Sequence, residues 1–338
     1  MAKPLKITAI VEEVNIPKED PEFKTAPPAR SMEHDVIRAL RELGHEVSIL
    51  GIYDRVEPIV EGIEKNPPDL VFNLVEQFAN DRRHDKNVAG LLEMMDIPFT
   101  GTGSAGLMLC RDKALCKQLL ATWNVKVPGF RIFPVGRPVS VPRSLGFPVV
   151  AKPAYADGSE GISNASLAKD PGELKERVDF LHDRFKQDVI AEEYVEGREL
   201  YIGVLGNRKL TVLPPYEIRF GTEEGGPVLA TYRVKWNKQY RERWKIEFGL
   251  SDLDRKVMAR VTEACCRAYR ILQLRDYARM DLRLTPEGRV VILEANPNPD
   301  ITRGEEMAEA AKKSGIDYKD FIRGIVEEAL ARHSNGRA

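Results

Sequence analysis

The chain has 338 residues, of which 43% are hydrophobic and 30% are charged, and its 51 Lys and Arg residues nearly balance its 52 Asp and Glu residues. This length exceeds one ordinary hydrophobic core, so the composition predicts a soluble globular protein of two or three domains. A net charge of −1 excludes a global field that would attract nucleic acid or a membrane surface, so any phosphate site must be local.

The apolar run near the N-terminus, Leu5–Val11, is too short for a signal peptide and is followed at once by Glu12 and Glu13. No later stretch has the uninterrupted apolar length of a membrane span. We therefore expect a cytoplasmic protein without a membrane partner. The four cysteines fit neither a disulfide framework nor a zinc pattern and are assigned no function: Cys110, Cys116, Cys265 and Cys266.

Strand and helix signals alternate in the first third of the chain. Apolar runs predict strands over Leu5–Val11, Val47–Leu50 and Asp69–Leu74, and periodicity predicts helices over Ser31–Leu43 and Val88–Met95. This alternation predicts a parallel sheet with helices on its faces, in an N-terminal α/β domain over residues 1–111. Residues 14–30 are rich in Pro, Lys and Glu, lack periodicity, and are predicted to form a long surface loop.

Two further units are predicted, over residues 112–197 and 198–338. The first contains predicted helices at Asp112–Trp123 and Gly172–Lys186 and predicted strands at Phe130–Phe133, Pro148–Pro153 and Val189–Val195. The second contains predicted strands at Leu200–Gly206 and Lys209–Leu213, an irregular stretch at Tyr216–Phe248, and predicted helices at Asp252–Leu272, Glu305–Lys313 and Tyr318–Arg332.

Two apolar strands near the C-terminus carry polar side chains on either side of a Pro-Glu-Gly turn at residues 286–288. Arg279 and Asp281 lie on the first strand, and Glu294 and Asn296 end the second. Side chains alternate faces along a strand, so a hairpin would bring Asp281, Glu294 and Asn296 together. Oxygen donors beside an arginine suit Mg²⁺ that carries nucleotide phosphates. An ordinary solvated hairpin fits these residues about equally well.

Lys152 ends another apolar strand and precedes a loop that contains Gly158, Ser159 and Gly161. Glycines let backbone amides approach an anion, so this loop could close over phosphates that Lys152 neutralises. The Gly-Lys-Ser/Thr signature of common NTPases is absent, and taken alone the loop is better explained as a surface hairpin. Carboxylates also cluster in the segment Glu192–Leu200, where they could accept hydrogen bonds from adenine and ribose or form a solvated acidic turn.

The order of these motifs resembles the ATP-grasp superfamily, and within it the D-alanyl-D-alanine ligase family. The matching segments are Asp69–Asn73, Gly90–Glu93, Ile97–Gly103, Asp112–Lys117, the Lys152 strand with its glycine loop, Glu192–Leu200 and the hairpin. Several ordered motifs between residue 69 and the C-terminus make chance agreement improbable. The resemblance implies an α/β (α+β) three-domain architecture, with ATP bound between the central and C-terminal domains.

The resemblance also implies roles for individual residues. ATP phosphates would be contacted by Lys113 and Lys152 with Ser159 and Gly161 above them, and adenine and ribose by Glu192, Val195 and Glu199. Two Mg²⁺ ions, for which Mn²⁺ could substitute, would be bound by Asp281, Glu294 and Asn296. The implied catalytic residues are Arg279, Ser159 and Lys235, the last in a segment that resembles the family's mobile lid, where Trp236 replaces the usual tyrosine.

The implied reaction joins a carboxylate to an amine. ATP phosphorylates the carboxylate, the amine attacks the acyl phosphate, and phosphate leaves behind a new amide bond. Such chemistry needs positioning and charge neutralisation, and a lid over Tyr216–Phe248 would exclude water. The implied partners are small amino-acid-like carboxylates and amines, and a homodimer is expected because dimers are common in the family.

The sequence departs from the family pattern at the start of the substrate site. A glycine-rich turn and a charged run normally follow the first strand, whereas this chain has Glu12, Glu13 and the long loop. We expect one of these two carboxylates to hold a substrate ammonium. Glu76 replaces a family histidine, and substrate binding and a local salt bridge or cap are equally weighted interpretations of it.

A second departure follows Asn296, where Asp300 and Glu305 replace a glycine and a serine of the family. Their charge would repel the carboxylate of a D-alanine acceptor unless Arg303 compensates, so we expect a different amine with an extra cationic group. An authentic D-alanyl-D-alanine ligase is the first alternative. The second is a nucleotide sensor or scaffold without turnover, which is disfavoured because buried charged groups are costly without a ligand.

Overall fold

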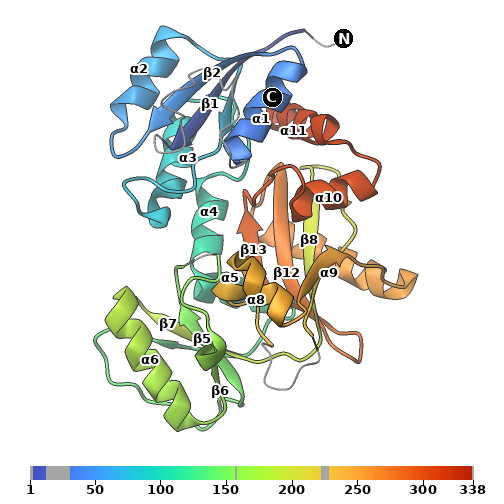
Figure 1. Cartoon of the computed structure of the whole chain (residues 1–338). Coiled ribbons are helices and arrows are strands. Elements are labelled where there is room, and N and C mark those ends of the chain that lie inside the picture. Colours follow the sequence, from blue (N-terminus) through green and yellow to red (C-terminus); the bar gives the residue numbers. More distant parts are fainter. Residues whose placement is uncertain (1–2, 13–30, 157, 222–227, 337–338) are drawn as a thin grey trace.

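The structure is a computed structural model that describes residues 3–12, 31–156, 158–221 and 228–336. Strands in this part of the chain form three sheets, which lie one after another along the molecule (Figure 1). The loop predicted at residues 14–30 falls outside the described residues, as does Glu13. No helix within the described ranges is long and apolar enough to cross a membrane.

The N-terminal sheet is parallel and has the strand order β2-β1-β3, as the alternation of elements predicted. Its strands are β1 (Lys6–Glu12), β2 (Glu46–Ile52) and β3 (Leu70–Asn73), and its helices include α1 (Met32–Glu42), α2 (Glu57–Lys65) and α3 (Asp85–Met94). The last helix of the chain, α11 (Tyr318–Gly336), packs beside α1 and shares its hydrophobic core (Figure 1). The last helix of the chain thus completes the hydrophobic core of the N-terminal domain.

Two helices within residues 1–111 were not predicted, namely α2 and α4 (Ser104–Arg111). Each contains a glycine that permits close packing against a neighbouring segment. A Cβ on Gly62 would lie 3.1 Å from Leu50, and a Cβ on Gly106 would lie 2.8 Å from the Gln273 carbonyl oxygen. These helices are stabilised by tertiary contacts, because glycine lowers helix propensity.

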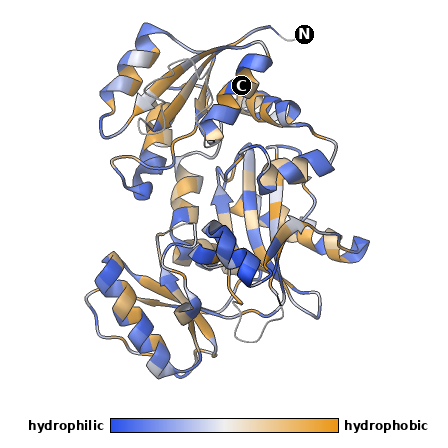
Figure 2. Ribbon diagram, viewed as in Figure 1, coloured by the Kyte–Doolittle hydropathy of each residue, from blue (hydrophilic) through white to orange (hydrophobic). Residues whose placement is uncertain are grey.

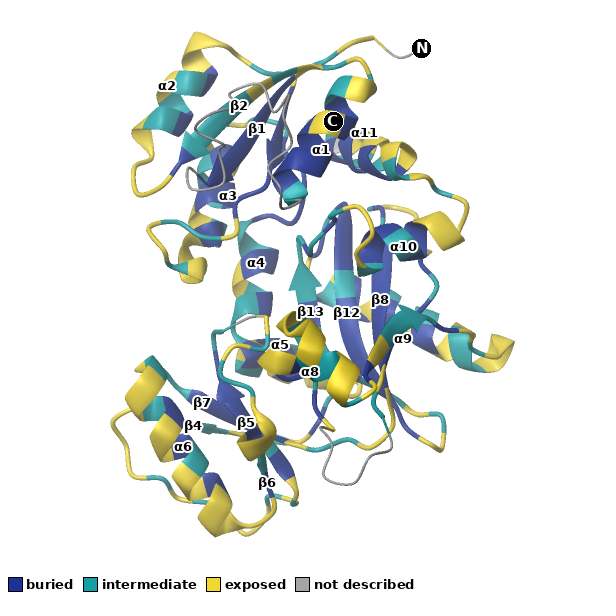
Figure 3. Ribbon diagram, viewed as in Figure 1, coloured by how far each residue is buried: buried dark blue, intermediate teal, exposed yellow. Residues whose placement is uncertain are grey.

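The central sheet is antiparallel, with the order β4-β7-β5-β6. Its strands are β4 (Phe130–Phe133), β5 (Val149–Pro153), β6 (Leu167–Ala168) and β7 (Val189–Glu193), and α6 (Pro171–Phe185) packs on it. The α6 residues Leu174, Val178 and Leu181 are fully buried, whereas the opposite face of the helix is exposed (Figure 3). The glycine loop connects β5 to β6 at the edge of this sheet.

The third sheet has the order β11-β10-β8-β12-β13, and β9 pairs with β8. Its strands are β8 (Arg198–Leu205), β9 (Thr211–Val212), β10 (Tyr216–Arg219), β11 (Glu247–Leu250), β12 (Tyr277–Leu284) and β13 (Val290–Pro297). Helix α9 (Arg255–Ile271) covers one face of this sheet, and α10 (Glu306–Lys313) contacts β8 and β11. Apolar and polar residues alternate along β8 and β12 (Figure 2), which are the most buried strands of this sheet (Figure 3).

The prediction of irregular structure over Tyr216–Phe248 was wrong. This stretch contains β10 and the start of β11, and between them two short helices, α7 (Tyr232–Trp236) and α8 (Lys238–Arg243). Side-chain oxygens of Thr231 and Asn237 cap these helices. Val234 and Ile246 pack with Ile218 in a small hydrophobic cluster, so packing against the sheet stabilises elements too short to show periodicity.

The three sheets fall within residues 1–111, 112–197 and 198–338, which we retain as proposed domain boundaries. Helix α5 (Lys113–Thr122) lies at the junction, in contact with α4, α9 and β13. Its Lys113 pairs with Glu294 of the third sheet and its Lys117 with Glu192 of the central sheet, so the site described next is built around this helix.

Candidate active site between the central and C-terminal sheets

The hairpin β12–β13 has the register that the alternation predicted. Asp281 pairs with Glu294 and Arg279 pairs with Asn296, with a bulge immediately after Asp281. Gly288 has a φ of 75° in the connecting turn, a conformation that glycine adopts without strain. The four polar side chains therefore share one face of the sheet, opposite the face that α9 covers.

Arg279 is held rigidly on this face. Its Nε and Nη2 atoms lie 2.8 and 3.1 Å from the two Asp281 carboxylate oxygens, and its guanidinium stacks 5.2 Å above the Tyr201 ring. Burial alone would lower the pKa of Arg279, but Asp281 and Glu306 outweigh it and the pKa is raised. The guanidinium is therefore a fixed positive charge beside Asp281.

Lys113 faces the hairpin from the first turn of α5, where Asp112 caps the helix. Its Nζ lies 2.9 Å from Glu294 Oε1. Burial lowers the pKa of Lys113, and Glu294 offsets only part of that shift. Burial would raise the pKa of Glu294, but Lys113 and Lys152 reverse the direction and keep it ionised.

Lys152 and Lys117 converge on a second buried carboxylate, Glu192, at 3.1 and 2.9 Å. Lys117 also donates to the Leu293 carbonyl oxygen at 2.6 Å. Lys117 was given no role from the sequence, although it lies four residues after Lys113 and therefore on the same helix face. Three lysines face only two carboxylates here, so this part of the site has an excess of positive charge.

One cavity joins the predicted groups into a single site. Its lining includes the predicted residues Lys152, Ser159, Glu192, Val195, Glu199, Lys235, Asp281 and Glu294. Residues predicted separately from the glycine loop, the acidic segment, the lid and the hairpin are thus brought together. Four residues predicted to bind ATP or Mg²⁺ or to act in catalysis are not in the lining, namely Lys113, Gly161, Arg279 and Asn296. Lys113 contacts Glu294, and Arg279 binds Asp281 and pairs with Asn296 across the hairpin.

Arg283 and Tyr201 are two further polar residues of this face that sequence reasoning missed. Arg283 Nη2 donates to Glu199 Oε2 at 2.7 Å, and the Tyr201 hydroxyl donates to Glu199 Oε1 at 3.1 Å. Arg283 also lines the cavity. It lies two residues after Asp281 on an apolar strand, and that alternation was the signal that could have identified it.

The glycine loop and the lid helix contact each other over the cavity. Ser159 has a φ of 63° and Gly161 a φ of 73°, and a Cβ on Gly161 would lie 2.7 Å from Pro153. Trp236 Nε1 donates to the Gly158 carbonyl oxygen at 3.2 Å. Lys235 Nζ lies 5.5 Å from the Tyr201 ring centroid, so the lid brings a cation near Arg279 and its aromatic support.

The donor set fits a cation bound together with phosphates better than a free metal ion. Within the described ranges, no three His, Cys, Asp or Glu side chains are placed to hold an ion. However, the Asn296 Nδ2 atom is buried there without a hydrogen-bond partner. Rotation of this carboxamide would present its oxygen instead. Two carboxylates and one amide oxygen match Mg²⁺, which takes its remaining ligands from phosphate and water.

A group of carboxylates surrounds the predicted substrate position. Glu12 accepts hydrogen bonds from the Glu76 and Gln77 backbone N–H groups at 3.3 and 3.1 Å. Burial raises the pKa of Glu33, and the charges of Glu12 and Asp300 raise it further. The pKa of Glu76 is also raised, by burial and then by Glu12 and Asp300, although Arg82 opposes them at 3.3 Å.

Arg303 does not neutralise this group. Its guanidinium stacks 4.7 Å above the Tyr318 ring, and its backbone N–H donates to Asp35 at 3.1 Å. Asp300 instead accepts a hydrogen bond from the Thr302 N–H at 2.8 Å. Partial burial raises the pKa of the exposed Glu305, followed by repulsion from Glu306 and Asp300. Glu33 was missed from the sequence because it looked like an ordinary first-turn helix residue.

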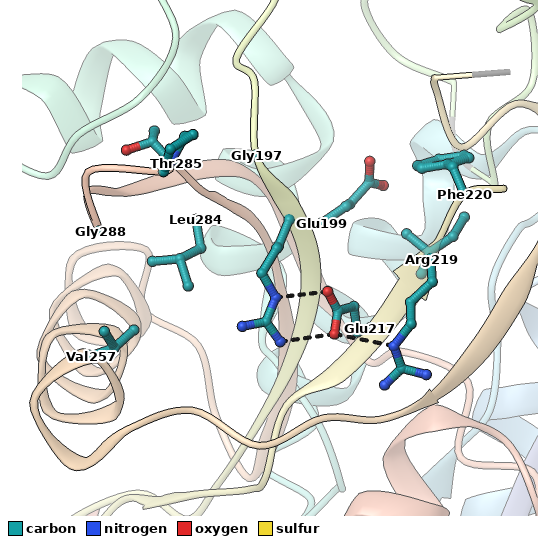
Figure 4. Close-up of a pocket in the computed structure, with 12 residues that line it drawn as sticks. Gly197, Glu199, Glu217, Arg219, Phe220, Val257, Leu284, Thr285 and Gly288 are labelled. Carbon is teal, nitrogen blue, oxygen red and sulfur yellow. Dashed lines mark hydrogen bonds and ion pairs between the residues drawn. The ribbon is translucent and has the colours of Figure 1, made fainter. Parts of the chain in front are cut away.

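A separate pocket lies beside this sheet and includes Arg198, Glu217 and Arg219 (Figure 4). Arg198 Nε lies 2.8 Å and Arg219 Nε 3.5 Å from the Glu217 carboxylate, and Ser251 donates to it at 2.6 Å. Glu199 lines both this pocket and the catalytic cavity, and its carboxylate is paired with Arg283. The charges of this pocket satisfy one another, which indicates a structural role.

Three comparisons relate the chain to known proteins. Residues 137–327 match the family model described as the D-ala D-ala ligase C-terminus. An uncharacterized protein, y4sG, of Sinorhizobium fredii is 32% identical over 90% of this chain and 89% of its own length. The D-alanine–D-alanine ligase of Aquifex aeolicus is 31% identical over 86% of this chain and 92% of its own length.

The fold is also similar to solved structures. The D-alanine–D-alanine ligase of Bacillus anthracis complexed with ATP has a TM-score of 0.77, at 20% identity, over 98% of this chain and 99% of that one. The D-alanine–D-alanine ligase from Coxiella burnetii has a TM-score of 0.67, at 17% identity, over 99% of this chain and 97% of that one. The predicted α/β (α+β) fold of the ATP-grasp type is therefore confirmed as the fold of those proteins.

Proposed function

Because the chain belongs to the D-alanine–D-alanine ligase family, we propose that it is an ATP-dependent ligase that joins a carboxylate to an amine through an acyl phosphate. The observation that carries this proposal is one cavity lined by Lys152, Asp281 and Glu294. Arg279 is paired with Asp281 and Lys113 with Glu294 beside it. That arrangement supplies positive charge for phosphates and oxygen donors for their cation.

Each residue has a definite task in the proposed reaction. Lys113 and Lys152 bind the phosphates of ATP, and Asp281, Glu294 and Asn296 would hold Mg²⁺, which neutralises phosphate charge when bound. Arg279 stabilises the charge that develops while the γ-phosphoryl group moves to the substrate carboxylate. The amine then attacks the acyl carbon, loses a proton, and inorganic phosphate departs. Ser159 and Lys235 close the site from the loop and the lid, and exclude water.

The acceptor amine carries, on our proposal, a second cationic group. Repulsion from Glu12 and Asp300 raises the pKa of both Glu33 and Glu76. The Arg303 guanidinium stacks on the Tyr318 ring and does not pair with these carboxylates. A second ammonium would relieve this repulsion, whereas the carboxylate of D-alanine would increase it. D-alanine as acceptor is the second candidate, because two relatives that are 31% and 29% identical to this chain are named D-alanine–D-alanine ligase.

ADP release tests both proposals in one assay. We expect ADP release only when a carboxylate and an amine are both present, with diamines and basic amino acids preferred over D-alanine by at least about tenfold in kcat/KM, a difference worth about 1.4 kcal/mol. Asp300→Asn should narrow that preference, and Asp320→Asn, on the surface of α11, should not. A preference for D-alanine would overturn the acceptor proposal, and nucleotide binding without any turnover would overturn the ligase proposal.

Glu33→Gln should stabilise the protein at neutral pH. The pKa of Glu33 is raised in the folded state, so its protonation stabilises the fold fully below the unfolded pKa, and that contribution is lost as pH rises through the folded pKa. Ionised Glu33 is therefore a cost at pH 7.5, and its removal should raise the Tm there by on the order of 1–3 °C, with a smaller gain at pH 4.5.

We base this prediction on Glu33 and not on Glu76, because the Glu33 residue is 7% exposed and the Glu76 side chain is 45% exposed. Glu42→Gln, near the exposed end of the same helix, is the matched control and should not raise the Tm. A Tm that falls at pH 7.5 in Glu33→Gln would show that the carboxylates are not in mutual repulsion.

A further inference from the structure

A second pocket, which borders the catalytic cavity and shares Ile162 with its lining, lies where the glycine loop, α6 and the lid helix α7 meet. It encloses about 740 Å³, within the range of small-molecule sites, and we call it the arginine–aromatic pocket. The side chains that characterise it are Arg177, Phe180, Arg184, Phe185, Tyr232 and Trp236. None of these six residues has a task in the proposed reaction.

The two arginines are not paired with a carboxylate in the described structure, although Glu160 also lines the pocket. Within the part of the chain that the structure describes, no ion pair is formed by Arg177 or Arg184, and burial alone lowers the pKa of Arg177. Arg177 Nη2 donates only to neutral acceptors, the Gly161 carbonyl oxygen at 2.7 Å and Ser166 Oγ at 3.0 Å. The pocket of Figure 4 differs, because there both arginines are paired with Glu217.

The aromatic rings are unusually exposed for their size. Phe180 is 50% exposed, Tyr232 56% and Trp236 62%, and all three line this one pocket. Arg177 stacks 4.9 Å above the Phe180 ring, and the spacing of residues 177, 180 and 184 places them on one face of α6. Clustered exposed rings of this kind mark binding surfaces more often than random surface positions.

The pocket is also preorganised. The Arg177 Nε atom is buried without a hydrogen-bond partner in the described structure, and two hydrogen bonds fix the guanidinium. Trp236 is held by its hydrogen bond to Gly158. Fixed guanidinium groups beside flat rings recognise a planar ligand that carries negative charge, because the anion pairs with arginine while its ring stacks.

We propose that the arginine–aromatic pocket binds a small aromatic anion, with a carboxylate or phosphate group directed to Arg177 and Arg184 and its ring among Phe180, Tyr232 and Trp236. Since the glycine loop and α7 form two of its walls, the bound anion holds them together. This inference concerns binding outside the cavity and does not depend on turnover.

Calorimetric titration of the whole protein tests the proposal with a matched set of ligands. Benzene-1,2-dicarboxylate and benzoate present carboxylates, phenyl phosphate presents a phosphate, benzamide lacks the charge, and cyclohexanecarboxylate lacks the flat ring. We expect binding of the aromatic anions, at least about tenfold weaker binding of benzamide and cyclohexanecarboxylate, and undiminished binding when ATP saturates the cavity. The stronger of the carboxylate and phosphate arms identifies the anionic group.

Arg184→Gln and Phe180→Leu are the test variants, because both side chains are exposed and their loss should leave the fold intact. Each should weaken binding of the aromatic anions by about tenfold. Arg131→Gln, which removes an exposed arginine from β4 of the central sheet, should not weaken it. Equal weakening by Arg131→Gln, competition by ATP, or no binding by any aromatic anion at millimolar concentration would overturn the proposal.

Discussion

Replacing Glu294 by Gln should lower amine-dependent ADP release by about 10²- to 10³-fold, the usual loss when one preorganised electrostatic group is removed from an active site. Glu294 faces Asp281 across the hairpin and pairs with Lys113 at 2.9 Å. Gln keeps the size of the side chain but removes the charge that a phosphate-bound cation requires. The measurement is kcat at saturating ATP over a range of Mg²⁺ concentrations.

The matched control is Glu287→Gln, which removes a carboxylate from the exposed turn of the same hairpin and should leave kcat unchanged. A thermal melt should accompany each assay, because Lys113 loses its carboxylate partner in Glu294→Gln and keeps its hydrogen bond to the Ala156 carbonyl oxygen. The pKa of Lys113 is already lowered by burial, so the lysine can lose its proton, which limits the destabilisation. Full activity in a folded Glu294→Gln protein would show that the cation site lies elsewhere.

Replacing Arg279 by Met should have the larger effect, a loss of about 10³-fold or more in kcat, comparable to the loss of an arginine that stabilises phosphoryl transfer in other enzymes. Affinity for ATP should change little, because the phosphates are assigned to Lys113 and Lys152. The structural basis is the double hydrogen bond to Asp281 and the stacking on Tyr201, which fix the guanidinium in one orientation.

Arg279→Lys separates charge from geometry. Lysine keeps the positive charge but cannot form two parallel hydrogen bonds with Asp281, so we expect activity between that of Arg279→Met and the unaltered protein. Arg289→Met, in the exposed turn, serves as the control. If Arg279→Lys were fully active, a positive charge of any shape would suffice. If Arg279→Met were fully active, the residue would have no catalytic task.

Local patterns predicted the parts of the fold that have a clear period. The alternation of Arg279, Met280 and Asp281 predicted a hairpin whose register places Asp281 beside Glu294. The succession of strands and helices predicted the parallel N-terminal sheet. Both features depend on residues within a few positions of each other, so one sequence is sufficient to identify them.

Features that depend on distant contacts were not predicted. Lys117 acquires its role from Glu192 and the Leu293 carbonyl, both remote in sequence. Glu33 joins the carboxylate group only because α1 lies near Glu12 and Asp300, and Gly106 permits a helix only because it packs on residues 272 and 273. Tertiary contacts override local propensity in each case.

The packing of α11 on α1 has a consequence for the synthesis of the protein. Phe321, Ile325 and Val326 complete a core whose other members include Val36 and Leu40. The first domain to leave the ribosome must therefore wait for the last helix before its apolar surface is covered. It cannot finish folding co-translationally, and a chain that ends early would leave an aggregation-prone N-terminal domain.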